Sequence, residues 1–395
     1  MNARTPVRYQ VSRAAVVIAA AAVPALALAG PPALAATAAG PASTTAGPAS
    51  TTASQASITA GPASANPYAP AFQHPYRRGA VPTRAAAARM RSWSASHPAA
   101  GGPPHPFGGG VDGIGVTTGP EKVYLVFDGS QWGTQGTGAN GVITLSGDPS
   151  GAAGILQRLF QGLGTGGELW SGVMTQYCDG VATGAQYCPA SNTEHVAYPV
   201  GGALAGVWVD ESSAAPAQAT AAQLGAEAVS AAAHFGNTTA AANRDAQYVV
   251  VSPASTHPDG FNTPSGQFCA WHDDNLDVGV SSPYGDIAFT NLPYVTDMGA
   301  SCGAGFVNPG GAGADDGFSI VAGHEYAETI TDQNPAGGWT DASGYETGDK
   351  CAWITPGTPG GAADLTLPTG TFAMQSTWAN DAGGCEFSHP IVSNG

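Results

Sequence analysis

The residues best suited to chemistry lie together in one short stretch, Gly323-His-Glu-Tyr-Ala-Glu328. His324 and Glu328 are four residues apart, so on a helix they would share one face, with Glu325 beside them. Their neighbours are apolar on nearly every side, which is typical of a buried helix: Phe318, Ile320, Val321, Ala322, Tyr326, Ala327 and Ile330. Because an unpaired buried charge is costly, these three polar side chains need partners or a metal ion.

The spacing His324-Glu325-x-x-Glu328 is that of the zinc-binding pattern H-E-x-x-H, with glutamate in place of the second histidine. It predicts that His324 and Glu328 bind a metal and that Glu325 is a general base. In a zinc site the metal would lower the pKa of a water, Glu325 would take its proton, and the hydroxide would attack a carbonyl. The alternative is an ordinary helix with one buried histidine and two surface glutamates.

A catalytic metal needs at least three protein ligands, and the acidic residues downstream offer the third. Glu346 resembles the downstream glutamate of gluzincins, and Asp341 loosely resembles the aspartate of aspzincins; Asp349 is a further candidate. One histidine and two carboxylates form a hard ligand set, which fits zinc but also favours manganese, iron or calcium.

The stretch Asp341–Asp349 allows two other interpretations. Its oxygen-bearing side chains around a glycine resemble a calcium loop, and it also has the composition of a plain turn held by Cys351. Two other histidines, His257 and His272, stand beside acidic residues in what we expect to be loops. Either could donate a proton or ligate a metal, although a surface histidine is the commoner case.

The N-terminal part has a different character from the rest of the chain. A basic start, an apolar run at Ala14–Ala29 and the Ala33-Leu34-Ala35 cleavage pattern predict a signal peptide over 1–35 and therefore a secreted protein. The repeats of 36–65 lack large apolar residues and predict disorder. The basic segment 66–118 is expected to be either a pro-segment, cut near Arg77-Arg78, or a linker, with a short helix over Thr83–Trp93.

The 28 acidic residues all lie between Asp112 and Glu386, and only four basic residues accompany them there. Such a surface disfavours binding to nucleic acid or anionic membrane, and it suits calcium or cationic partners. Several tryptophans could stack on wall sugars if exposed, although each is more typically a packing residue: Trp132, Trp271, Trp339, Trp353 and Trp378.

The six cysteines indicate a disulfide-bonded domain, because their number is even and the chain is expected to be exported. We expect sequential pairing, although fifteen pairings are open to six cysteines. The expected pairs are Cys178 with Cys188, Cys269 with Cys302, and Cys351 with Cys385. Metal binding by these cysteines is disfavoured because no C-x-x-C spacing occurs.

Apolar runs and helical periodicities alternate along 119–395. They predict an α/β (or α+β) fold with a mixed sheet, flanking helices and the buried H-E-x-x-E helix over Gly317–Asp332. Strands are expected at Lys122–Phe127, within Glu194–Asp210, at Gln247–Val251 and at Ile287–Thr290, and helices after Asp148 and over Ala217–His234. We expect one acidic globular domain without a second boundary.

Several motifs also resemble a bacterial secreted family related to the plant phosphate-induced, EXORDIUM-like, extracellular proteins. The resemblance covers about Lys122–Phe387 and rests on Gly323–Asp332, Trp339–Trp353, Phe268–His272, Asn291–Asp297 and Ser301–Gly303. It implies an extracellular, cell-wall-associated protein and does not imply a particular reaction.

Two functional hypotheses follow. The first is a secreted metal-dependent hydrolase, a zincin-like endopeptidase acting as a monomer on extracellular protein or cell-wall substrates, with zinc held by His324, Glu328 and Glu346. The second is a non-catalytic, EXORDIUM-like module that interacts with carbohydrate and carries a structural calcium. Neither hypothesis involves nucleic acid or membrane insertion.

Overall fold

A computed structural model describes residues 66–97 and 104–394, which belong to one compact unit, Ile58–Gly395. The expected signal peptide (1–35) and low-complexity segment (36–65) lie outside the described residues. Within the described part, no helix has the length and hydropathy needed to cross a membrane.

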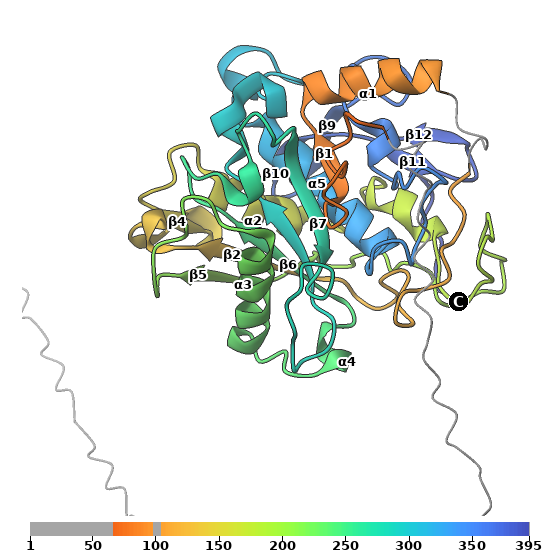
Figure 1. Cartoon of the computed structure of the whole chain (residues 1–395), viewed down its shortest axis with the longest axis horizontal. Helices are drawn as coiled ribbons and strands as arrows, with labels where there is room; N and C mark the ends of the chain where they lie inside the picture. Colours follow the sequence, from red (N-terminus) through yellow and green to blue (C-terminus); the bar gives the residue numbers. More distant parts are fainter. Residues whose placement is uncertain (1–65, 98–103, 395) are drawn as a thin grey trace, which may run out of the picture. The chain divides into compact units, whose positions relative to one another are not determined.

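A six-stranded mixed sheet forms the centre of the fold, as predicted (Figure 1). Its neighbours run in the order β1-β7-β8-β6-β2-β5. Strands β2, β5, β6 and β8 are parallel, whereas β7 is antiparallel to β8 and β1 is antiparallel to β7. The bounds are β1 Arg78–Pro82, β2 Lys122–Asp128, β5 Leu204–Asp210, β6 Ala246–Val251, β7 Phe268–Asp274 and β8 Ala288–Leu292.

Helices cover both faces of this sheet (Figure 1). On one face α2 (Ala152–Gly162) packs against α5 (Asp316–Thr331), and α3 (Ala221–His234) covers the other. All sixteen residues of α5 are buried, which confirms the expected buried helix. Helix α3 begins four residues later than predicted because the Thr220 side chain caps it by accepting a hydrogen bond from Gln223 N.

Smaller elements complete the unit. Helices α1 (Arg84–Ser96) and α4 (Ala240–Asn243) are short, and two-stranded sheets join β3 (Gln135–Thr137) to β4 (Ile143–Leu145), β9 (Ala363–Leu367) to β10 (Gly370–Met374), and β11 (Thr377–Ala379) to β12 (Gly384–Glu386). Short 3-10 helices lie at Ser130–Trp132, Ala139–Gly141, Ser171–Gln176, Pro258–Gly260, Val295–Cys302, Gly310–Gly313 and Asp349–Cys351. Strand β10 packs on α5, so the C-terminal part closes the side of α5 that faces away from the sheet.

The three disulfides join Cys178 to Cys188, Cys269 to Cys302 and Cys351 to Cys385, which confirms the sequential pairing. The second of them ties β7 to the turn before α5, and the third ties the loop after α5 to β12. Two of the three therefore brace elements beside the H-E-x-x-E helix.

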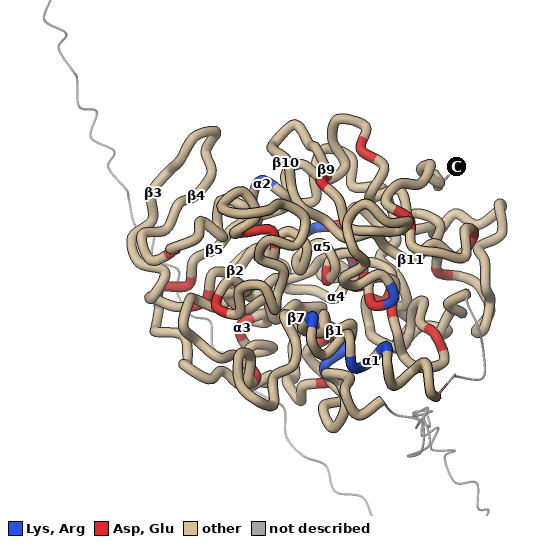
Figure 2. The backbone as a smooth tube through the Cα atoms, turned by 90° about the horizontal axis from the view of Figure 1, so that it is seen from above, with Lys and Arg blue, Asp and Glu red and all other residues tan. Residues whose placement is uncertain are grey.

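The basic segment is part of the packed unit, contrary to the expected start of the globular domain at residue 119. Val81 and Ala87 join the hydrophobic core, as do Phe107 and Val116. Figure 2 shows the largest group of Lys and Arg residues on β1 and α1, with Asp and Glu spread over the rest of the unit. The predicted helix is α1, capped by Thr83, whose side chain accepts a hydrogen bond from Ala86 N.

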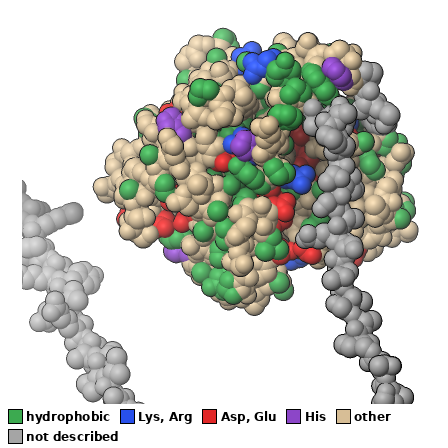
Figure 3. Space-filling view, viewed as in Figure 1, with side chains coloured by type: hydrophobic (Ala, Val, Ile, Leu, Met, Phe, Trp, Pro, Cys, Tyr) green, Lys and Arg blue, Asp and Glu red, His purple; other side chains and the backbone are tan. Residues whose placement is uncertain are grey.

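The five tryptophans that could stack on sugars are not exposed on the surface. Trp132, Trp271, Trp339, Trp353 and Trp378 are all buried. On the face seen in Figure 3, hydrophobic side chains are dispersed among polar ones. The large hydrophobic residues that are exposed also come from separate parts of the described chain, among them Tyr187, Val200 and Leu276.

Glu121, just before β2, predicts a pH dependence of stability. Burial, and then the charge of Asp245, raises the pKa of Glu121 to about 8 from a usual 4.5, and neither carboxylate oxygen has a hydrogen-bond partner among the described residues. Because the unfolded chain loses this proton near pH 4.5 and the folded chain keeps it, stability should fall as pH rises from about 4.5 to 8. Glu121→Gln should therefore stabilise the protein at pH 8, by up to about 4 kcal/mol, and leave it unchanged at pH 4. Thermal unfolding at the two pH values checks this, and an equal gain at both would contradict it.

Candidate metal centre

Helix α5 places His324, Glu325 and Glu328 inside the molecule, each at most 1% exposed. His324 Nε2 lies 3.0 Å from Glu328 Oε2, as the i, i+4 spacing predicts. The Gln375 amide sets the orientation of the imidazole. Gln375 Nε2 donates to the Gly348 carbonyl, so Gln375 Oε1 is left to accept from His324 Nδ1 at 3.0 Å. The lone pair of a neutral His324 is then on Nε2, the nitrogen that faces Glu328, which is the form that binds metals.

Glu328 is held by the loop that follows α5. Its Oε1 accepts hydrogen bonds from the backbone amides of Gly348 and Asp349, at 2.9 and 2.8 Å. Its Oε2 has no hydrogen-bond partner among the described residues and points toward His324. One oxygen therefore fixes the side chain and the other remains free to bind an ion.

Asp349 completes a three-residue group with His324 and Glu328, in which one ligand atom from each lies within 4.8 Å of the others. Asp349 Oδ1 is 3.9 Å from His324 Nε2, and Asp349 Oδ2 accepts from Glu346 N at 3.0 Å. Of the candidates for the third ligand, Asp349 is thus the one brought to His324.

Asp341 is engaged elsewhere. Its Oδ1 accepts from Ser343 N and Tyr345 N, and its Oδ2 forms an ion pair with Lys350 at 3.0 Å. Among the described residues Asp341 belongs to none of the groups that could hold a metal. The prediction of Asp341 as a ligand is therefore not supported, and the plain-turn interpretation describes its surroundings.

The structure corrects the expectation that His272 lies in a surface loop. His272 is on β7, is fully buried, and its Nε2 lies 2.9 Å from Glu346 Oε2 and 4.0 Å from Glu328 Oε2. It also forms a compact group with Glu325 and Glu328. Glu346 thus joins the site as the partner of His272. The signal that could have identified a strand was the apolar run Phe268–Trp271 directly before His272.

The carboxyl group of Glu325 lies in a buried environment that favours its protonated form. Both of its oxygens are buried without hydrogen-bond partners among the described residues. Burial, followed by the charges of Glu328 and Glu346, raises the pKa of Glu325 well above its usual range. Burial lowers the pKa of His324, with Asp349 opposing, so His324 favours the neutral form.

The charge balance of this centre fits a divalent cation. Four carboxylates (Glu325, Glu328, Glu346 and Asp349) meet two imidazoles, and no ion pair joins any of them to a Lys or Arg within the described ranges. Uncompensated buried carboxylates are unfavourable. Tetrahedral zinc ligands at about 2.0–2.2 Å from the metal lie roughly 3.3 Å apart, close to the His324–Glu328 separation.

Comparison with protein-family models, with characterised proteins and with solved structures finds no match for this chain. The function must therefore be argued from the geometry of the site.

Proposed function

We propose that this protein is a secreted metal-dependent hydrolase, a zincin-like endopeptidase. His324, Glu328 and Asp349 would hold the metal, zinc being favoured by the imidazole nitrogen and the tetrahedral spacing. The observation that carries the proposal is the pairing of the free His324 Nε2 with the unpartnered Glu328 Oε2 in a buried acidic centre. The bound ion would supply Lewis-acid polarisation and a water acidic enough to react near neutral pH.

The protein's own groups account for the proton transfers. Glu325 takes a proton from the attacking water as the water oxygen bonds to the peptide carbonyl carbon. It then returns the proton to the amine nitrogen as the C–N bond breaks. His272, held by Glu346, lies beside Glu325 and Glu328 and would stabilise the carbonyl oxygen as that oxygen gains charge.

The alternative, a carbohydrate-interacting module with a structural calcium, has less support. The tryptophans that would stack on sugars are buried. The side chain of Asp341, the first residue of the suggested calcium loop, is already bound to Ser343, Tyr345 and Lys350.

Metal content of the purified full chain tests the proposal. We expect about one zinc per chain by mass spectrometry, and its loss in His324→Ala, because that change removes a ligand from a three-ligand site. His105→Ala is the matched control. His105 is equally buried, and its Nδ1 contacts the Trp339 carbonyl. Within the described residues, it belongs to none of the groups that could hold a metal ion.

Two outcomes would contradict the hydrolase. Absence of metal from the parent chain would leave the centre as a buried polar network. If calcium is the only metal found and the His324→Ala variant retains it, the ion is bound at another site.

A further inference from the structure

Strand β1 lies along the edge of the sheet, directly beside the metal centre. It pairs antiparallel with β7, with Arg78 opposite His272 and Val81 opposite Ala270 (Figure 1). The strand comes from the basic segment before residue 98, and its partner β7 carries His272. The centre is therefore covered by a part of the chain that lies far from it in sequence.

Gly79 is the point of closest approach. A Cβ atom at this position would overlap Glu328 Oε2 and His272 Nε2, and the φ angle of +45° disfavours any side chain. Only a glycine lets the backbone come this close, and its presence shuts the centre off from solvent.

Arg77 anchors the strand on one side of the centre. Arg77 Nε donates to Asp259 Oδ2 and Arg77 Nη2 to the Asp259 carbonyl, both at 2.7 Å. The guanidinium also lies 4.8 Å from the centroid of the Phe268 ring. Arg77 is 3% exposed, so a protease could not reach the Arg77-Arg78 bond while β1 is in place.

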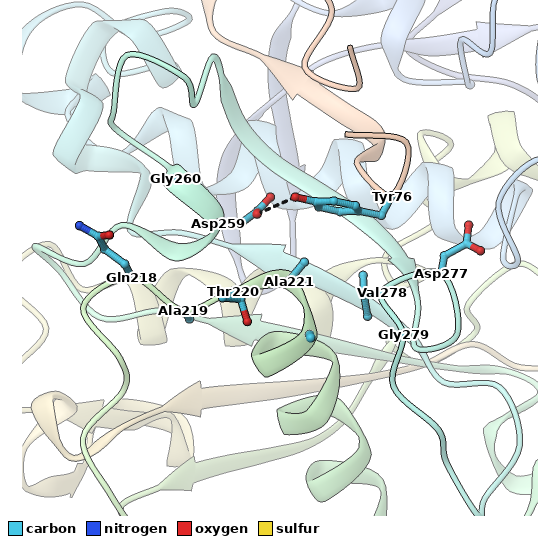
Figure 4. A pocket seen from close by; sticks show the side chains of 11 residues that line it. Tyr76, Gln218, Ala219, Thr220, Ala221, Asp259, Gly260, Asp277, Val278 and Gly279 are labelled. Atoms are coloured by element: carbon cyan, nitrogen blue, oxygen red, sulfur yellow. Dashed lines mark hydrogen bonds between the residues drawn. The ribbon is translucent and has the colours of Figure 1, made fainter. Parts of the chain in front are cut away.

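A pocket of about 590 Å³ continues from this anchor (Figure 4). Its wall includes Asp259 and Asp277, and Tyr76 lies in it with its hydroxyl donating to Asp259 Oδ1 at 3.0 Å. The remaining lining residues are mostly small, and Asp259 both closes this pocket and pairs with Arg77, so the cationic side chain is recognised at Asp259.

We propose that β1 occupies the groove in which a polypeptide substrate binds, and that residues 66–97 keep the enzyme closed until they leave it. The substrate is an extended peptide, antiparallel to β7, with arginine two residues before a glycine that lies over the metal centre. This inference rests on the proposed function. An added strand gains backbone hydrogen bonds from the sheet edge and specificity from side-chain pockets, and β1 uses both.

The two parts of the segment are held to different degrees. Helix α1 buries only Ala86, Ala87 and Met90 of its thirteen residues, whereas four of the five residues of β1 are buried. Strand β1 is held by its pairing with β7, by the Arg77–Asp259 ion pair and by the Trp353 Nε1 hydrogen bond to the Pro82 carbonyl. Because it is an edge strand, it can leave without breaking the pairing of the parallel strands.

The test measures peptide binding by the full chain carrying Gly79→Ala, whose methyl group forces β1 out of the groove. A fluorescent peptide with the sequence of residues 74–84 should bind this variant at least tenfold more tightly than it binds the parent. The same peptide with alanine in place of Arg77 should bind at least tenfold more weakly. Adding Asp259→Asn should remove that difference between the two peptides.

Gly113→Ala is the matched control. Gly113 also has a positive φ, of +82°, but no atom lies within 4 Å of a Cβ built there. The alanine variant therefore adds backbone strain without overlap, and it should bind the peptide as weakly as the parent does. If Gly79→Ala fails to fold, Arg77→Ala in the parent removes the anchor without any overlap and should also increase binding.

The outcomes separate the two proposals. If the folded variants bind no peptide, even while cleaving other substrates, β1 is a purely structural strand. That result would contradict the proposed peptide-binding groove. Binding of the arginine peptide without cleavage would support the groove and contradict the hydrolase.

Discussion

Replacing Glu325 with glutamine is expected to lower peptide hydrolysis by about 10²- to 10⁴-fold, the usual contribution of a general base. Glutamine has the same shape but cannot accept the water proton, while His324 and Glu328 remain in place to bind the metal. Zinc content and thermal stability should therefore be unchanged. The measurement is the hydrolysis rate of the variant whose groove is opened by Gly79→Ala, with and without Glu325→Gln, alongside its metal content.

Glu121→Gln is the matched control for this experiment. It makes the same substitution at another buried glutamate whose carboxylate oxygens have no hydrogen-bond partner among the described residues. Glu121 belongs to none of the residue groups in the described part of the chain that could hold a metal ion. With Glu121→Gln added, the hydrolysis rate should equal that of the Gly79→Ala variant alone. Full activity in Glu325→Gln would exclude Glu325 as the base.

The second large effect is expected at Asp349. Asp349→Asn should weaken zinc binding by about 10²-fold or more, because loss of a ligand costs at least as much as loss of an outer-shell partner, which costs roughly 10- to 100-fold. Zinc retention during dialysis against a chelator measures this effect.

Asp341→Asn, the same change eight residues earlier, provides the comparison. Its carboxylate caps a turn and pairs with Lys350, so zinc binding should be unaffected. Equal losses in both variants would contradict the assignment of Asp349. Zinc lost in His272→Ala but retained in Asp349→Asn would instead make β7 the source of the third ligand.

Local sequence patterns predicted the parts of the fold that depend on local physics. The apolar surroundings of His324 indicated a buried helix, and α5 runs from Asp316 to Thr331. The apolar run from Lys122 indicated β2, because a strand buried on both faces needs few polar residues. The pairing of six cysteines in sequence order was also correct.

Contacts between distant segments could not be predicted in the same way. His272 reaches Glu346 because β7 lies beside α5 and the loop after α5 folds back onto Glu328, and nothing in the sequence around His272 shows that neighbour. The choice between Asp341 and Asp349 depends on which carboxylate forms the turn, and both have the same local composition. Gly79 looks like an ordinary loop glycine until β1 is placed over Glu328.

The pairing of β1 with β7 also affects the order in which the molecule assembles and comes apart. These strands are separated by nearly two hundred residues, whereas β7 and β8 are joined by a short connection. Closing the long loop becomes less costly once the intervening chain is compact, so β1 should dock after the rest of the sheet. The reverse process should begin with β1, through a local opening that costs less free energy than global unfolding. The backbone amides of β1 should then exchange with deuterium faster than those of β6. Under the proposed groove, the rate of that opening would limit how quickly a newly folded chain can accept a peptide.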